Sequence, residues 1–295
     1  MTARIEVGVS GWSYPDWKGI VHPRSCRDTL RFVAELVDLI EINVTFYRTP
    51  SREMVASWVS RTQDLGTAFT AKLPQRATHD GVVDAAESAA FRAALAPLAD
   101  SGRLAALLAQ FSFRLQADAD GFARLHAIAA TYGGVAPLLL EVRHASWRAA
   151  DAQRRALDLG FRPIHLDYPD MDSGFCGPGD ALGREPGIEY LRLHGRNTRA
   201  WFDKEAGRDA TYDWLYSANE VAWIEQRLRS LAALGQASRV MVAANNHFRG
   251  QAVVLALQLA SFARRAKVAV PESLLRTYPQ LDAIARSAQR GLFDP

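Results

Sequence analysis

The chain of 295 residues is 48% hydrophobic and 23% charged, a balance that excludes an intrinsically disordered protein and predicts a sizeable core. Its net charge of +3 is spread along the sequence without a dense Lys/Arg run, so nucleic acid has only weak support as a partner. The two cysteines lie far apart and indicate neither a disulfide framework nor a zinc ribbon.

Strand-like runs alternate with helical patterns along the whole chain. The first run begins by residue 4 with no basic-then-apolar leader before it, and no apolar run is long enough to span a membrane, so we expect a cytoplasmic protein without a membrane partner. The predicted strands are 4–10, 39–46, 68–73, 104–110, 137–144, 161–167, 188–194 and 239–245. The predicted helices are 29–37, 51–65, 85–99, 121–132, 146–159, 217–234 and 251–263, with a last one within 271–290.

This order predicts an α/β fold, a single (β/α)₈ TIM-barrel domain over residues 1–295. An open doubly wound sheet is the alternative, but its glycine-rich phosphate turn is absent from the sequence. One unit is irregular, because residues 168–187 are rich in Gly, Pro and Asp and show no helical period. We expect a long loop there in place of the helix between strands six and seven, forming a lid or a wall of the site.

Charged residues follow the apolar run of the fifth predicted strand. In the sequence P-L-L-L-E-V-R-H-A-S-W at 137–147, Glu141 and Arg143 share one face and lie roughly 7 Å apart along the strand. A charge removed from water costs several kcal/mol unless it is paired or lines a wet cavity. The two charges therefore indicate either a structural ion pair across the barrel or part of a polar site.

The same pattern recurs at the ends of the other strands, where TIM-barrel active sites lie. Because side chains alternate, we expect Ile, Leu and Val to face the helices and the polar residues to face the barrel axis. On the sixth strand this places His165 and Asp167 inside and Leu166 outside. The polar strand-end residues are Glu41, Asn43, Lys72, Gln110, Glu141, Arg143, His144, Asp167, Arg192, His194, Asn245 and Asn246.

These residue types favour a small anion as ligand. Lys72, Arg143 and Arg192 can bind phosphate or carboxylate, with the remaining amide and imidazole side chains as further binding groups. As candidate catalytic acids and bases we take Glu41, Glu141, Asp167 and His194. The same four residues are a possible set of ligands for a divalent metal, but the interleaved Arg and Lys would compete for the carboxylates, so we predict no cofactor.

Three functions fit this pattern. The first is an enzyme that acts on a small phosphate- or carboxylate-bearing molecule by metal-independent general acid–base catalysis. The second is a metal-dependent phosphodiesterase or endonuclease-like protein that acts on nucleic acid. The third is a non-catalytic ligand-binding or partner protein. No motif for an activated nucleophile is present in the sequence.

Segments along nearly the whole chain resemble one family, the YecE-like proteins, also called domain of unknown function seventy-two. The matching segments are G-V-S-G-W at 8–12, E-I-N-V-T-F-Y at 41–47, A-K-L-P at 71–74 with T-H at 78–79, E-V-R-H-A-S-W at 141–147, 190–196 and N-N-H at 245–247. The resemblance implies a bacterial-type TIM-barrel protein without a settled activity, and its segments add Trp12, Tyr47, His79 and Arg196 to the candidate binding residues. The chain departs from the family pattern at residues 111–113 and at His22 before Pro23.

Overall fold

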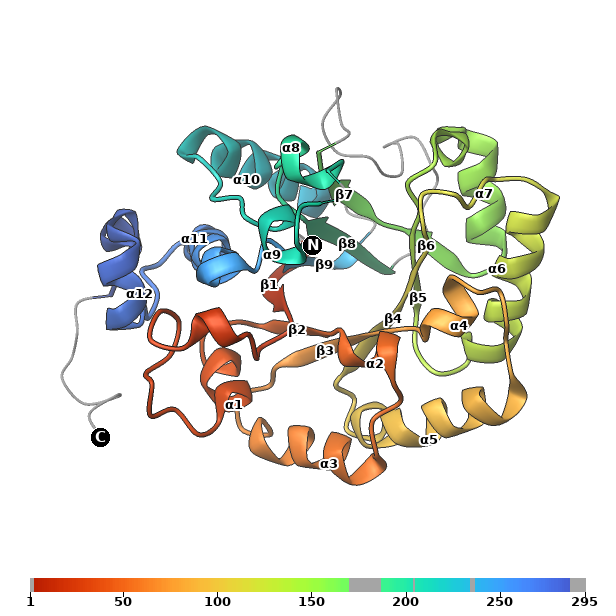
Figure 1. The fold of residues 1–295 in the computed structure, drawn as a ribbon, viewed down its shortest axis with the longest axis horizontal. Coiled ribbons are helices and arrows are strands. Elements are labelled where there is room, and N and C mark those ends of the chain that lie inside the picture. Colours follow the sequence, from red (N-terminus) through yellow and green to blue (C-terminus); the bar gives the residue numbers. More distant parts are fainter. Residues whose placement is uncertain (1–2, 170–186, 204, 234–236, 287–295) are drawn as a thin grey trace.

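Parallel strands form a barrel with the helices packed around it, as Figure 1 shows for the computed structural model. The structure describes residues 3–169, 187–203, 205–233 and 237–286. The strands in these residues are β1 (Arg4–Ser10), β2 (Leu39–Ile42), β3 (Ala68–Lys72), β4 (Leu104–Gln110), β5 (Leu138–Glu141), β6 (Phe161–Pro163), β7 (His165–Asp167), β8 (Gly187–Leu193) and β9 (Ala237–Ala244). The predicted TIM barrel is confirmed.

The helices cover the outer face of the strands. They are α1 (Thr29–Ala34), α2 (Val44–Tyr47), α3 (Arg52–Arg61), α4 (Gln75–Thr78), α5 (Ala85–Asp100), α6 (Ala119–Tyr132), α7 (Ala150–Asp158), α8 (Thr198–Trp201), α9 (Arg208–Thr211), α10 (Ala218–Ala233), α11 (Gln251–Arg264) and α12 (Glu272–Thr277). Short 3₁₀ helices are η1 (Pro15–Trp17), η2 (Ala145–Arg148), η3 (Phe248–Gly250) and η4 (Pro279–Ile284). None of the helices in the described part of the chain is long and apolar enough to cross a membrane.

The sixth predicted strand is divided into β6 and β7, and this division closes the barrel. The sheet order is β6-β5-β4-β3-β2-β1-β9-β8-β7, so β6 pairs with β5 while β7 pairs with β8 at the other end. Ile164, between them, still donates its N–H to the carbonyl of Leu140 at 3.0 Å. One chain segment therefore changes partners and joins the two ends of the sheet.

Two strands are shorter than expected and end close to the point where a neighbouring strand ends. The last residues of β1 and β4 pair with Glu41 and Glu141. β5 ends at Glu141, and β2 ends one residue after Glu41, at Ile42, which still pairs with Ala71 of β3. The predicted strands 39–46 and 137–144 are wrong in their last residues: α2 follows β2, and Arg143 lies in a loop. The predicted helix 146–159 is divided into η2 and α7, and most of the irregular segment 168–187 lies outside the described residues.

The core has two parts. The larger one packs the outward side chains of the strands, such as Ile40, Leu140 and Val242, against the helices. The smaller one fills the barrel below its C-terminal mouth with Leu39, Leu139, Met241 and their neighbours. The expectation that large apolar side chains face only the helices is therefore wrong, because the lower interior of the barrel is apolar and only its upper end is polar.

Candidate functional site

A buried ion network occupies the upper end of the barrel, with Arg192 at its centre. The Arg192 guanidinium donates from Nε and Nη2 to the two carboxylate oxygens of Glu41, at 3.0 and 2.6 Å, and from Nη1 to Glu141. All three side chains are fully buried. A bidentate guanidinium–carboxylate pair is the strong form of such a contact, and burial of three charges requires it.

Further donors complete the network. Ser10 and Tyr190 donate hydroxyl hydrogen bonds to Glu41, at 2.5 and 2.9 Å. The carboxylate Oε1 of Glu141 accepts from Gln110 Nε2 and Arg143 Nη2, both at 2.6 Å. Both carboxylates are thus bound from several directions, and two carboxylates balance two guanidiniums.

The surroundings keep both carboxylates ionised. Burial by itself raises their pKa values, but the positive charges of Arg192 and, for Glu141, of Arg143 outweigh it and lower the pKa of each carboxyl, that of Glu141 well below its usual range. Neither Glu41 nor Glu141 lines the cavity described below. They are weak bases at positions beneath the mouth, so the geometry favours a supporting role over the catalytic role expected from the sequence.

Lys72 differs from Arg143 and Arg192 because no carboxylate of the described residues forms an ion pair with it. Its side chain is half-buried at the end of β3, and within the described residues its Nζ makes no hydrogen bond or ion pair. Nζ lies 5.0 Å from the centre of the Phe46 ring. Burial lowers the pKa of the Lys72 ammonium to about 8, and the positive charge of Arg192 acts in the same direction. At pH 7 about a tenth of this side chain is the neutral amine.

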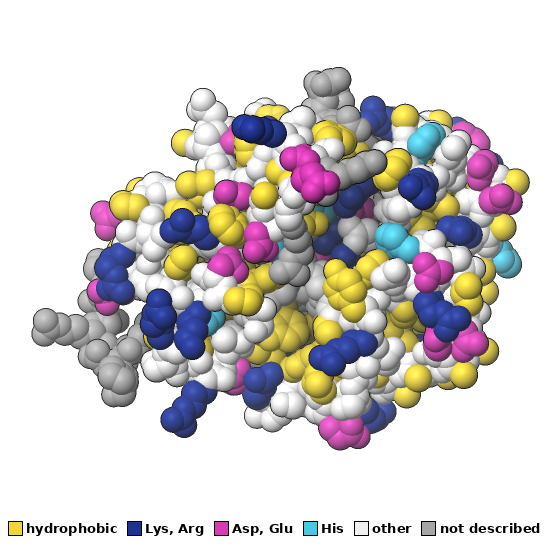
Figure 2. All heavy atoms as spheres, viewed as in Figure 1, with side chains coloured by type: hydrophobic (Ala, Val, Ile, Leu, Met, Phe, Trp, Pro, Cys, Tyr) yellow, Lys and Arg dark blue, Asp and Glu magenta, His cyan; other side chains and the backbone are white. Residues whose placement is uncertain are grey.

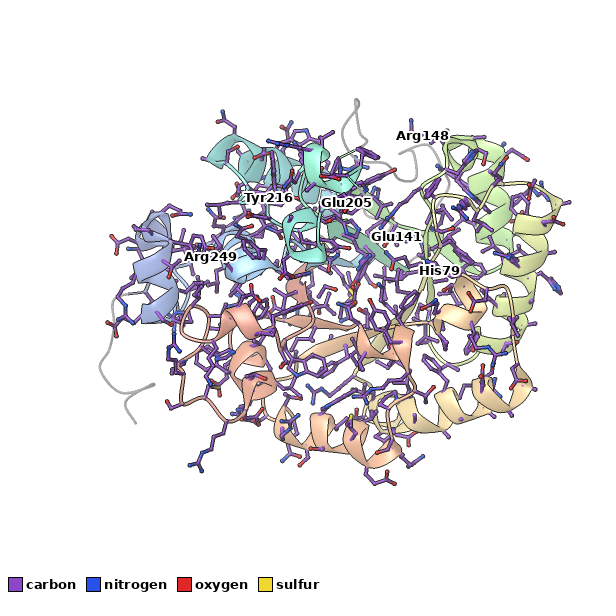
Figure 3. The ribbon with its side chains drawn as sticks, viewed as in Figure 1. His79, Glu141, Arg148, Glu205, Tyr216 and Arg249 are labelled. Carbon is purple, nitrogen blue, oxygen red and sulfur yellow. The ribbon has the colours of Figure 1, made fainter. Side chains whose placement is uncertain are left out.

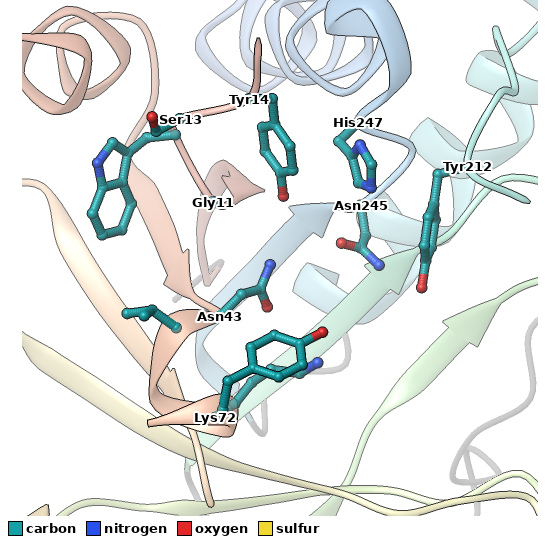
Figure 4. Close-up of a pocket in the computed structure, with 11 residues that line it drawn as sticks. Gly11, Ser13, Tyr14, Asn43, Lys72, Tyr212, Asn245 and His247 are labelled. Atoms are coloured by element: carbon teal, nitrogen blue, oxygen red, sulfur yellow. The ribbon is translucent and has the colours of Figure 1, made fainter. Parts of the chain in front are cut away.

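A cavity of about 240 Å³ opens beside Lys72 at the C-terminal ends of the strands (Figure 4). Figure 2 shows this face of the molecule hollowed near its centre. Among the described residues that line the cavity, none is acidic, and Lys72 alone is a lysine or arginine. The lining residues are Gly11, Trp12, Ser13, Tyr14, Asn43, Val44, Tyr47, Lys72, Tyr212, Asn245 and His247.

One wall of the cavity consists of stacked rings. Gly11 follows β1 with φ of +80°, and after this turn the Tyr14 hydroxyl donates a hydrogen bond to the Ser10 carbonyl at 2.6 Å. The Tyr14 ring stacks on His247, with ring centres 4.3 Å apart, and Tyr212 covers the other side of the wall at 4.8 Å from His247. This wall of the cavity is therefore aromatic.

Two amides connect the cavity with the buried network. Asn43 Nδ2 donates to Ser10 Oγ at 2.8 Å, while its buried Oδ1 has no partner in the described structure. Asn245 Nδ2 lies 2.9 Å from Nδ1 of His194, and His194 Nε2 lies 3.6 Å from Glu141. Burial lowers the pKa of His194 to about 4, and Arg192 acts in the same direction, so the imidazole is neutral at pH 7.

The sixth strand places Asp167 on the outer face of the barrel, and the predicted orientation is wrong. In the register of β7 and β8, Leu166 lies beside the inward Arg192 and Asp167 lies beside the outward Leu193. Asp167 accepts from Arg196 Nε at 2.8 Å and from the Tyr216 hydroxyl at 2.7 Å. Figure 3 labels Tyr216 beside α10 and Glu141 within the ring of strands. Polar partners on the helix side made the outer face suitable for a carboxylate.

Four other predicted residues lie away from the cavity wall. Arg196 joins Asp167 on the outer side, and Asn246 donates to the carbonyl of Trp214 at 2.8 Å. His144 caps η2 by accepting from the Ser146 N–H at 3.2 Å. His79 follows α4 and packs edge-on against Phe46, with ring centres 5.0 Å apart.

The predicted set of metal ligands does not come together. Asp167 faces away from Glu41, Glu141 and His194, and Arg192 occupies the oxygens of both glutamates. In the described part of the chain, no three His, Cys, Asp or Glu side chains form a group suited to a metal ion. The donor set thus gives no support to the metal-dependent phosphodiesterase.

The sequence-based selection omitted Ser10, Tyr14, Tyr190, Tyr212 and His247. Ser10 and Tyr190 could have been included by the strand rule, because both lie on inward positions of β1 and β8. Nothing in the local pattern shows that Tyr212, in the long connection after β8, returns to the mouth. The position of Tyr212 depends on the path of the loop, which strand or helix periodicity does not predict.

The fold and the site together define a TIM-barrel protein with a small, lysine-lined cavity over a buried ion network. The chain belongs to the family described as "Protein of unknown function DUF72", whose model matches residues 6–279. The resemblance to the YecE-like family is therefore confirmed. No protein with a curated description matches the chain.

Solved structures of the same family resemble this chain over nearly their whole length. A DUF72 family protein from Thermotoga maritima is 28% identical, with a TM-score of 0.75 over 88% of this chain and 99% of that one. Another, from Enterococcus faecalis, is 24% identical, with a TM-score of 0.74 over 88% and 95% of the two chains. At 24% identity, the similarity to the Enterococcus faecalis protein concerns the fold alone.

Proposed function

We propose that the protein is an enzyme that binds a small anionic molecule in the Lys72 cavity and acts on it without a metal. The observation that carries the proposal is the charge of the site. Glu41 and Glu141 balance Arg143 and Arg192, so the Lys72 ammonium is a surplus positive charge directed at a cavity with no acidic lining residue. A phosphate or carboxylate group supplies the missing negative charge.

The remaining lining groups suit such a ligand. Asn43 and Asn245 place amides, and Tyr47 and Tyr212 place hydroxyls, around the same space as Lys72. Tyr47 is 72% exposed at the rim, whereas burial raises the pKa of Tyr212 and keeps its hydroxyl protonated. With a volume of about 240 Å³, the cavity holds a metabolite smaller than a drug-sized ligand.

In this proposal the general base differs from the one expected from the sequence. Lys72 has a pKa of about 8 and lines the cavity, so it can both pair with an anion and accept a proton near neutral pH. The glutamates bind Arg192 and Arg143, and the charges of these four side chains act together on the pKa of Lys72. General acid–base catalysis uses a group that gains and loses a proton near neutral pH, whereas binding of an anion uses only the positive charge.

Binding of inorganic phosphate, measured by titration calorimetry, tests the proposal. Lys72→Met should weaken binding about tenfold or more, because a partly desolvated charged hydrogen bond contributes about 1.5–3 kcal/mol. Lys72→Arg retains the charge and should stay within about threefold of the wild type. Binding should also weaken as the pH rises through about 8, where the Lys72 ammonium loses its proton. The exposed Lys267→Met is the matched control, and a wild-type affinity in Lys72→Met would refute the anion site.

A further inference from the structure

We propose that Lys72 forms a covalent imine with its substrate, which is therefore an aldehyde or ketone that carries a phosphate or carboxylate group. This inference rests on the proposed function and specifies the substrate class of the same cavity. It starts from the position of the amine: Lys72 Nζ lines an open cavity and has no hydrogen-bond or ion-pair partner among the described residues. An amine in this state can approach a carbonyl carbon without first leaving another contact.

The identity of the residue supports amine chemistry over simple charge. Only four lysines, at 18, 72, 204 and 267, occur among the 35 Lys and Arg residues of the chain. The other positive charges of the buried network are the guanidiniums of Arg143 and Arg192, and guanidiniums bind anions bidentately and cannot act as nucleophiles at neutral pH. Arginine would serve better for anion binding alone, so a lysine at this position adds a reactive nitrogen.

The surroundings favour the neutral amine that attack requires. Lys72 is partly buried, lies against the Phe46 ring, and has two guanidiniums, Arg143 and Arg192, among the charges that lower its pKa. A desolvated lysine beside another cation is the arrangement that activates imine-forming lysines. The amine fraction at pH 7 is about two hundred times that of a lysine with an ordinary pKa.

The step balances without a further reactant. The neutral amine attacks the carbonyl carbon, a C–N bond forms, and the carbonyl π electrons move to oxygen. The oxygen takes up a proton while the nitrogen gives one up, which produces a neutral carbinolamine with a free lone pair on nitrogen, and a second proton then adds to the hydroxyl. The nitrogen lone pair then expels the protonated hydroxyl as water, leaving a protonated imine. Tyr212 and Tyr47 hydroxyls line the same cavity and can transfer these protons. The protonated imine keeps the positive charge of Lys72, so the anionic group of the substrate remains paired.

Reductive trapping tests the imine. Wild-type protein is treated at pH 7.5 with glyoxylate or pyruvate and sodium borohydride, and adducts are mapped to individual lysines by peptide mass spectrometry. Lys72 should be modified at least about tenfold faster than the exposed Lys267, because its neutral amine fraction is far larger. Lys72→Arg should give no adduct at position 72 while still binding inorganic phosphate, and Lys267→Arg should leave the reaction at Lys72 unchanged.

The outcomes separate the two proposals. Selective trapping at Lys72 supports the imine. Trapping at Lys72 no faster than at Lys267, with phosphate still bound, overturns the imine and leaves the anion site in place. If the wild-type protein shows neither trapping at Lys72 nor phosphate binding, both the imine and the proposed function are overturned.

Discussion

Arg192→Met is expected to lower the free energy of unfolding by about 5 kcal/mol or more at pH 7, since removal of one partner from a buried ion pair costs about 3–5 kcal/mol. Here one guanidinium binds two carboxylates, and Glu41, Glu141 and Arg192 are all fully buried. Its loss leaves Glu41 without its bidentate partner and Glu141 with Arg143 alone as its ion-pair partner. Urea unfolding followed by circular dichroism measures the change.

An exposed ion pair provides the matched control. Arg276 pairs with Glu272 on the surface of α12, with both side chains more than half exposed. Arg276→Met should change stability by less than about 1 kcal/mol. The deficit of Arg192→Met should shrink as the pH falls, because burial raises the pKa of the two carboxyls once Arg192 no longer outweighs it, and they then take up protons in the folded state. A cost at pH 7 similar to that of Arg276→Met would show that the network does not hold the barrel mouth together.

Lys72→Met is expected to raise the free energy of unfolding by about 2 kcal/mol at pH 7, the opposite of what removal of a structural residue does. The folded protein binds the Lys72 proton less tightly than the unfolded chain, because burial and Arg192 lower the pKa from 10.5 to about 8. The unfolded chain therefore holds more protons between these two pH values, and stability rises across this interval. Below about pH 8 the unfavourable ammonium is present in full, so the gain from Lys72→Met is largest there.

The pH dependence separates this effect from better packing of the methionine. The advantage of Lys72→Met should disappear above about pH 10.5, where the wild-type lysine is neutral in both states. Lys267→Met, at an exposed position, should stay within about 0.5 kcal/mol of the wild type at every pH. Thermal unfolding at pH 7 and pH 10.5 measures the stability difference between Lys72→Met and the wild type. A lower stability of Lys72→Met at pH 7 would mean that the wild-type ammonium makes favourable contacts, in contradiction to this prediction.

The barrel could be predicted from the sequence because its signal is repeated. Eight strand-like runs occur, and a helical period separates all but one pair of neighbouring runs, so one misplaced boundary does not change the order. The strand ends were less predictable. β5 stops at Glu141, which pairs with the last residue of β4, and β2 stops at Ile42, one residue after the residue that pairs with the end of β1. That information lies in the register of the neighbouring strands. The division of the sixth strand at Ile164 depends on closure of the barrel, which no local pattern records.

The candidate site could be predicted as a set of residues but not as a set of roles. Glu41, Lys72, Glu141, Arg143 and Arg192 do meet at one end of the barrel. Alternation alone could not distinguish the inner from the outer face of the sixth strand, because the partners of Asp167 come from a distant loop. Nor could it show that the glutamates are paired internally, leaving Lys72 alone directed at the cavity.

The central claim is that Lys72 is a surplus cation with a lowered pKa that faces the cavity. The pH dependence of its acetylation rate, measured by mass spectrometry under trace acetic anhydride, tests this claim directly, with Lys267 in the same sample as internal reference. We predict a midpoint near pH 8 for Lys72, in agreement with the pKa of about 8 that burial and Arg192 impose. A midpoint at or above pH 10, or a Lys72 that does not react at any pH, would contradict it.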